Sequence, residues 1–177
     1  MKKLHYPIHD HSQKRLLGSI EGLEGGFAIF AGIVAGLSFT TSHRTVLIMT
    51  ALIGIMVNAV NAATIRYSTE HYIDELDGHE KRNKTKYYLL PAIIEFILYL
   101  VVSLLAVIPL LIIGNLYVAV AVMVGICLVI LFVAGMARGA ALGNHAIRDG
   151  IELVIGGSIM IIIGAAAGWL LTHIFVK

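Results

Sequence analysis

Residues 96–137 read FILYLVVSLLAVIPLLIIGNLYVAVAVMVGICLVILFVAGMA and contain no Asp, Glu, Lys or Arg. As a single helix, these 42 residues would extend about 63 Å, roughly twice the thickness of the hydrocarbon core of a bilayer. The stretch must therefore fold back on itself, and the dipeptide Gly114-Asn115 is the place in it that favours a turn. The sequence predicts two membrane-spanning helices joined at this turn.

The composition of the whole chain is that of an integral membrane protein. Its 177 residues are 58% hydrophobic and 14% charged, whereas soluble domains are about 45–50% hydrophobic and about 25% charged. A soluble domain of this length cannot bury so much apolar surface, and a mean hydropathy of +0.88 excludes a disordered chain. The near balance of 13 Lys and Arg against 11 Asp and Glu argues against a nucleic-acid partner.

The remaining apolar stretches complete a prediction of one membrane domain, residues 1–177, with five transmembrane helices. The spans are expected at about 17–40, 45–65, 88–113, 116–137 and 152–175, with a cytosolic loop at about 66–87. The N-terminal residues 1–15 have a basic start but no apolar core, so a cleaved signal peptide is not expected. The predicted fold class is an all-α integral membrane protein.

Basic residues predict the orientation of these helices. Eleven Lys and Arg fall in the N-terminal tail and in the loops after the second and fourth spans, whereas Arg44 and Lys177 fall on the opposite side. By the positive-inside rule, the N-terminus is cytosolic and the C-terminus is on the far side. This layout fits the cell membrane if the source is prokaryotic, or a vacuolar-type membrane if it is eukaryotic.

Five oxygen-bearing side chains are predicted to share one depth in the cytosolic half of the membrane. They come from three spans: Glu21, Glu24, Asn58, Asn61 and Glu95. Counting from the nearest basic residues places them about 8–13 Å below the interface. An acidic residue at the centre of a span costs roughly 2.5–3.5 kcal/mol, so it usually marks a pathway or a site. Carboxylates with amide oxygens suit a divalent cation, and carboxylates can also carry protons.

Each of these residues also has a structural interpretation. Glu21 can extend to the aqueous interface, and this interpretation applies less to Glu24 and Glu95 because they are deeper. Asn58 and Asn61 can form hydrogen bonds that hold neighbouring helices together.

A second set of candidate ligands follows the second span. If that helix continues into the cytosol, Glu70 and Asp74 share one face, and His71, Glu75 and His79 form another row at four-residue steps. Either row can hold a divalent ion at a cytosolic entrance. The alternative is a solvated helix extension that binds nothing.

Small residues in the first span predict close helix packing. Gly18, Gly22 and Gly26 form one row at four-residue steps, and a second row contains Ala28, Gly32 and Gly36. Such rows let helix backbones approach each other in lipid. The two rows make the first span a candidate for a homodimer interface, with packing inside one chain as the alternative.

The first span resembles the first helix of the vacuolar iron transporter family. Residues 18–36, GSIEGLEGGFAIFAGIVAG, are similar to the family's Asp-Gly-Leu, Phe-Ala and Ala-Gly pattern, and Glu21 falls on its transport aspartate. Shorter similarities occur at Tyr67, at IPLL (residues 108–111) and at RDGIELVIGG (residues 148–157). The resemblance extends over most of the chain.

This resemblance implies a homodimer that moves Fe²⁺ or Mn²⁺ out of the cytosol in exchange for protons, along a pathway between the two first helices. Because Glu21 falls on the family's transport aspartate, it is expected to be the principal ligand and proton carrier. The shared depth of the polar side chains adds Glu24, Glu95 and Asn61 to the expected shell. Ala62 stands where the family has a methionine. Losing a soft ligand while adding the oxygens of Glu95 favours a harder ion.

The combined expectation is a divalent metal transporter in the lipid bilayer, without a prosthetic group and without enzymatic activity. Two alternatives remain open. One is a membrane-embedded metal-binding protein or metalloenzyme, which the clustered carboxylates also suit. The other is a non-transporting membrane scaffold, in which the glycine rows serve assembly alone.

Overall fold

The computed structural model describes residues 11–41, 43–76, 78 and 83–175, with side chains described from residue 25 onward. Within this part, the chain is helical and has no strand. The elements are α1 (His11–Thr40), α2 (Arg44–Leu76), the π-helical turn η1 (Thr85–Leu89), α3 (Leu90–Ile112), α4 (Leu116–Leu142) and α5 (Ala146–Phe175). The prediction of an all-α fold is confirmed.

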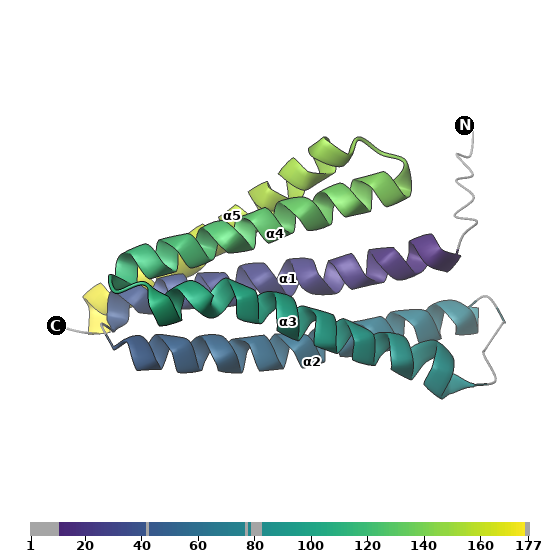
Figure 1. The fold of residues 1–177 in the computed structure, drawn as a ribbon, viewed down its shortest axis with the longest axis horizontal. Helices are drawn as coiled ribbons and strands as arrows, with labels where there is room; N and C mark the ends of the chain where they lie inside the picture. The colour runs from purple at the N-terminus through teal and green to yellow at the C-terminus, as the bar shows by residue number, and fades with distance from the viewer. Residues whose placement is uncertain (1–10, 42, 77, 79–82, 176–177) are drawn as a thin grey trace.

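The long helices alternate in direction and form one elongated bundle (Figure 1). Helix α1 runs between the α2–α3 hairpin and the α4–α5 hairpin, and it packs against α2, α4 and α5. The connections from α1 to α2 and from α3 to α4 lie at one end of the bundle, and the other two connections lie at the opposite end. Toward that second end, the α4–α5 hairpin diverges from α2 and α3.

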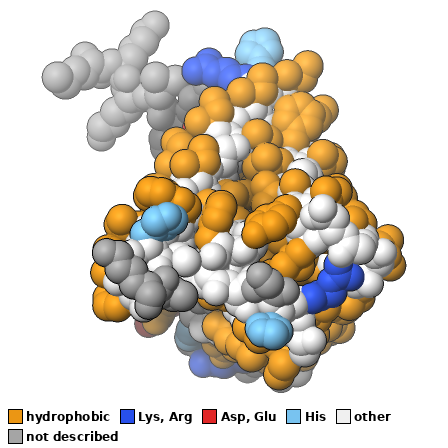
Figure 2. Space-filling model, turned by 90° about the vertical axis from the view of Figure 1, so that its left-hand side faces the viewer, with side chains coloured by type: hydrophobic (Ala, Val, Ile, Leu, Met, Phe, Trp, Pro, Cys, Tyr) orange, Lys and Arg blue, Asp and Glu red, His pale blue; other side chains and the backbone are white. Residues whose placement is uncertain are grey.

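Among the described residues, four helical segments have the length and composition needed to cross a membrane: α2, Thr85–Ile112, α4 and α5. In α1, the part with described side chains is the apolar segment Gly25–Thr40, which is shorter than a full span. Large hydrophobic side chains remain exposed on every long helix, and they cover much of the face in Figure 2. This surface is compatible with an integral multi-pass membrane protein, whereas five spans and their orientation stay predictions.

The turn between α3 and α4 falls at the predicted dipeptide. Helix α3 ends at Ile112, and Asn115 caps α4 because its side-chain oxygen accepts hydrogen bonds from the backbone nitrogens of Tyr117 and Val118 at 3.0 and 3.3 Å. Arg44, the first residue of α2, donates to the Gly114 carbonyl oxygen at 2.6 Å. The two connections at this end of the bundle are therefore joined to each other.

Helix α2 extends well beyond the predicted span at 45–65. It continues to Leu76, so the first half of the predicted loop at 66–87 is helical. This is the continuation into which Glu70, His71, Asp74 and Glu75 were expected to fall.

Glycines bring α1 and α5 into backbone contact. A Cβ on Gly36 would lie 2.5 Å from the Gly164 carbonyl oxygen, and one on Gly168 would overlap the Gly36 carbonyl. A Cβ on Gly32 would lie 3.2 Å from the Met160 carbonyl oxygen. The row of Ala28, Gly32 and Gly36 therefore packs inside the chain, against α5.

Candidate functional site

A polar stripe follows the buried face of α3. Glu95, Tyr99 and Ser103 occur at four-residue steps, and the exposed fractions of their side chains are 2%, 0% and 0%. Residues four apart share one face of an α-helix. The stripe therefore brings a carboxyl and two hydroxyl groups to the interior of a helix that is otherwise almost entirely apolar.

Helices α1 and α2 meet this stripe at Tyr99. Gly26 of α1 makes room for the tyrosine, because the Tyr99 hydroxyl and ring occupy the space that a Cβ on Gly26 would need. Asn58 of α2 donates from Nδ2 to the Gly26 carbonyl oxygen at 3.3 Å. The Tyr99 hydroxyl lies beside the side chains of Ser103 and Asn58. Three helices thus contribute polar groups at one level of the bundle.

The two predicted asparagine ligands differ in their positions. Asn58 is partly buried and reaches α1, whereas Asn61 is exposed on the surface of α2. Of this pair, the structure brings only Asn58 to the polar level at Tyr99.

Glu21 and Glu24 belong to α1, which is continuous from His11 to Thr40. Their side chains lie outside the described residues. In the helix, positions 21 and 24 precede Gly26 by five and two residues, toward the N-terminus.

Glu95 also lines a cavity of about 430 Å³ beside α3. Its charged lining residues are Arg66, Lys86 and Glu95, and its other lining residues are Tyr87, Leu90, Pro91, Ile94 and Leu98. The Arg66 side chain is buried and forms an ion pair with Glu70, with an Nη2–Oε1 distance of 2.8 Å. A guanidinium keeps its charge at any physiological pH. The lining of this cavity therefore combines a buried carboxyl group with two basic side chains.

The candidate entrance residues have separate environments on α2. Glu70 pairs with Arg66, and Asp74 is buried and accepts a hydrogen bond from the Tyr88 hydroxyl at 3.0 Å. The His71 ring lies 5.1 Å from the Tyr88 ring, between centroids. Glu75 is exposed. His79 lies outside the described residues.

Among the side chains that the structure describes, no three His, Cys, Asp or Glu converge in a group able to hold a metal ion. Glu70 pairs with Arg66, Asp74 accepts a hydrogen bond from Tyr88, and Glu75 is exposed.

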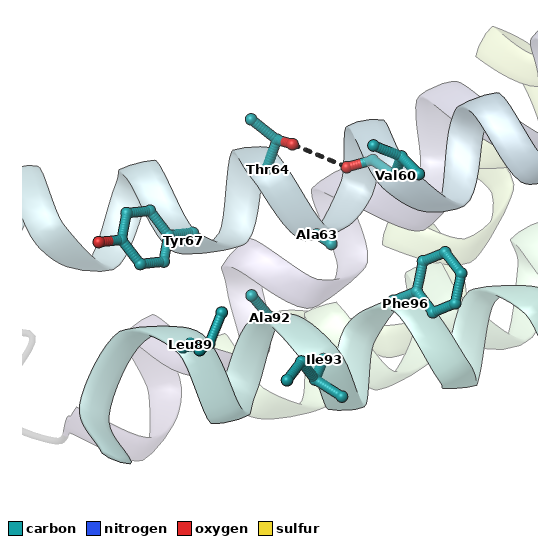
Figure 3. Close-up of a pocket in the computed structure, with 8 residues that line it drawn as sticks. All are labelled: Val60, Ala63, Thr64, Tyr67, Leu89, Ala92, Ile93 and Phe96. Atoms are coloured by element: carbon teal, nitrogen blue, oxygen red, sulfur yellow. Dashed lines mark hydrogen bonds between the residues drawn. The ribbon is translucent and has the colours of Figure 1, made fainter. Parts of the chain in front are cut away.

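Another cavity, of about 330 Å³, lies between α2 and α3 (Figure 3). It is lined by Val60, Ala63, Thr64, Tyr67, Leu89, Ala92, Ile93 and Phe96. The Thr64 hydroxyl donates to the Val60 carbonyl oxygen of its own helix at 2.8 Å. This cavity is apolar and contains none of the predicted ligands.

Comparison with known proteins gives no match: the chain matches no family model, no curated protein and no solved structure. The site is therefore interpreted from its own residues. The site contains the carboxyl group of Glu95, the hydroxyls of Tyr99 and Ser103, and the amide of Asn58. Two further carboxylates, Glu21 and Glu24, precede Gly26 in the sequence of α1.

Three residues of the site were not singled out in the sequence. Tyr99 and Ser103 carry a recognisable signal, since they continue from Glu95 at four-residue steps in an apolar helix. Arg66 falls at the start of the predicted cytosolic loop at 66–87, yet its side chain is 4% exposed and belongs to the bundle. Its signal is the i, i+4 spacing to Glu70.

Proposed function

We propose that this protein is a multi-pass membrane transporter that moves a divalent metal cation, Fe²⁺ or Mn²⁺, out of the cytosol in exchange for protons. The observation that carries this proposal is the burial of Glu95, whose side chain is 2% exposed within an apolar helix. A carboxyl group in such a place is costly, and it is typically retained for ion or proton movement.

The proposed metal site centres on α1 rather than on Glu95 alone. Arg66 lines the same cavity as Glu95, and a nearby guanidinium disfavours a divalent cation held by a single carboxylate. Glu21 is accordingly the principal ligand in this proposal, with Glu24 beside it in the sequence. Glu95 and Asn58 supply further oxygens, Asn58 from the position where α2 meets α1.

Proton coupling follows from the chemistry of the same groups. A carboxylate in a low-dielectric environment is stabilised by a bound cation and becomes neutral by protonation when the cation leaves. Metal and protons thus compete for Glu21, Glu24 and Glu95. Opposite movement of the two is the expected consequence.

In this proposal the protein is a homodimer, and the first helix, α1, forms the interface. Ala28, Gly32 and Gly36 pack against α5 in the same chain, so the proposed contact uses the N-terminal part of α1, where Gly18 and Gly22 continue the first glycine row.

Flux of Fe²⁺ or Mn²⁺ into proteoliposomes, driven by an imposed pH gradient, tests the function. The variant Glu21→Gln should abolish gradient-dependent flux. The matched control is Glu152→Gln, because Glu152 is an exposed carboxylate on α5. Unchanged flux in Glu21→Gln would contradict the role of this residue.

A second measurement distinguishes the alternatives if well-folded protein shows no flux under reducing conditions. Metal that stays bound through purification would favour a membrane metalloenzyme or metal-binding protein. A scaffold would bind no metal through its polar layer, so Glu24→Gln combined with Glu95→Gln would cause no loss of metal binding.

A further inference from the structure

The cavity beside α3 has a basic end and an apolar wall. Lys86 and Arg66 provide the basic end. Leu90, Ile94 and Leu98 follow at four-residue steps along α3, with exposed fractions of 50%, 57% and 45%. The wall extends about 12 Å from Leu90 to Leu98 at 1.5 Å per residue. We call these five residues the α3 groove.

The α3 groove lies where a phospholipid of the cytosolic leaflet would meet the protein. Lys86 belongs to η1, which directly precedes the apolar helix α3, and the surrounding segment is the basic one that the positive-inside rule places in the cytosol. A lipid headgroup lies at this level, and its acyl chains extend into the hydrocarbon core. The α3 groove matches this arrangement, because its cations correspond to the headgroup and its aliphatic side chains correspond to the acyl chain.

Charge complementarity identifies the class of lipid. The cations Lys86 and Arg66 outnumber the one acidic side chain of the lining, Glu95. The Arg66 side chain is 4% exposed and forms a 2.8 Å ion pair with Glu70, so the exposed Lys86 provides most of the attraction for an anion. Basic pockets between helices on the cytosolic side of a membrane favour anionic headgroups. A free phosphate would match only the basic end and would leave the aliphatic wall unused.

We propose that the α3 groove binds an anionic phospholipid of the cytosolic leaflet. The phosphate lies at Lys86 and Arg66, and one acyl chain lies along Leu90, Ile94 and Leu98. This site uses neither Glu21 nor Glu24, but it shares Glu95 with the proposed metal site. Lipid binding is therefore measured without metal, so that its failure and a failure of metal transport are distinguishable. Glu95 lines the inner side of the same cavity, so the bound lipid lies between this carboxyl group and the bilayer.

Native mass spectrometry of the full chain in detergent tests this site. The protein is titrated with dioleoyl phosphatidylglycerol or with dioleoyl phosphatidylcholine, and phosphatidylglycerol is expected to bind more tightly. Lys86→Gln should weaken phosphatidylglycerol binding by about fivefold, the effect of one basic residue at a membrane surface. Lys84→Gln is the matched control, since Lys84 is exposed two residues away and does not line the cavity.

A second pair of variants tests the apolar wall. Leu98→Trp fills the groove and should weaken binding of both lipids, whereas Ile97→Trp, at a neighbouring exposed position outside the groove, should not. Glycerol 3-phosphate should fail to displace the lipid. Equal affinity for the two lipids, equal losses in Lys84→Gln and Lys86→Gln, or displacement by glycerol 3-phosphate would each overturn the proposal.

Discussion

The hydroxyl of Tyr88 donates a hydrogen bond to Oδ2 of Asp74 at 3.0 Å, and both side chains are buried. The bond joins the end of α2 to η1, the π-helical turn that leads into α3. Turns of this kind are rare and occur often at functional sites. Here the hydrogen bond to Asp74 and the packing of the Tyr88 ring on His71 and Tyr67 hold the turn against α2.

Replacing this tyrosine should loosen the connection between α2 and α3. Tyr88→Phe keeps the ring but removes the donor, and a lost hydrogen bond to a charged group costs about 1.5–3 kcal/mol. Thermal unfolding in detergent measures the loss. Tyr72→Phe is the control, since the Tyr72 side chain is 60% exposed. Equal stability of the two variants would show that the Asp74 bond contributes nothing.

The contact between α1 and α5 should be sensitive to a single methyl group. A Cβ at Gly168 would overlap the backbone of Gly36, so Gly168→Ala should lower the free energy of unfolding by about 1–3 kcal/mol through overpacking. Gly156→Ala on the same helix is the control, because no atom lies within 4 Å of its Cβ position. Thermal unfolding of both variants in one detergent makes the comparison, and matching losses would contradict the contact.

The approach of Gly26 to Tyr99 predicts a functional effect. Gly26→Ala should displace the Tyr99 ring and the hydrogen bond of Asn58, and it should reduce gradient-driven metal flux. Gly25→Ala is the adjacent control, as its Cβ would meet no atom within 4 Å. Gly25→Ala should itself stabilise the helix by up to about 1 kcal/mol, because alanine has a higher helix propensity than glycine. If the two variants transport alike, the polar level at Tyr99 is not part of the pathway.

The predicted orientation is tested by labelling from each side of the membrane. In a Cys127→Ala background, Lys84→Cys should react with a membrane-impermeant maleimide from the cytosolic side, and Gly114→Cys should react from the opposite side. The basic segment around Lys84 is the physical reason. Each position serves as the control for the other. Labelling of both from one side would contradict the assignment of the two ends of the bundle.

The sequence predicted the turn between α3 and α4 because that turn depends on local properties. Residues 96–137 have too much apolar length for one span, and Gly114-Asn115 is the place where they can turn. The structure has its connection there, with Asn115 as the cap of α4. Hydrophobic length and capping residues act within a single segment, so they can be recognised without a tertiary fold.

Which side chains of a helix face the interior of the bundle depends on how the helices pack. Asn58 and Asn61 have the same chemistry and lie one turn apart, yet only Asn58 reaches α1. The rotation of α2 about its axis decides between them, and that rotation depends on how its buried residues fit the neighbouring helices. A helix that is apolar on all sides gives little indication of its buried face.

The sequence by itself thus determined an all-helical chain with the apolar length of a membrane protein, because bilayer thickness and helix rise limit where an apolar chain can bend. Only the tertiary structure decided that Gly36 meets α5, that Arg66 pairs with Glu70 inside the bundle, and that Tyr99 occupies the space beside Gly26. The contacts of Gly36 and of Tyr99 join separate helices, whereas Arg66 and Glu70 both belong to α2 and are enclosed by the helices packed around them. Their geometry arises from the rotation and crossing of whole helices, which local sequence does not specify.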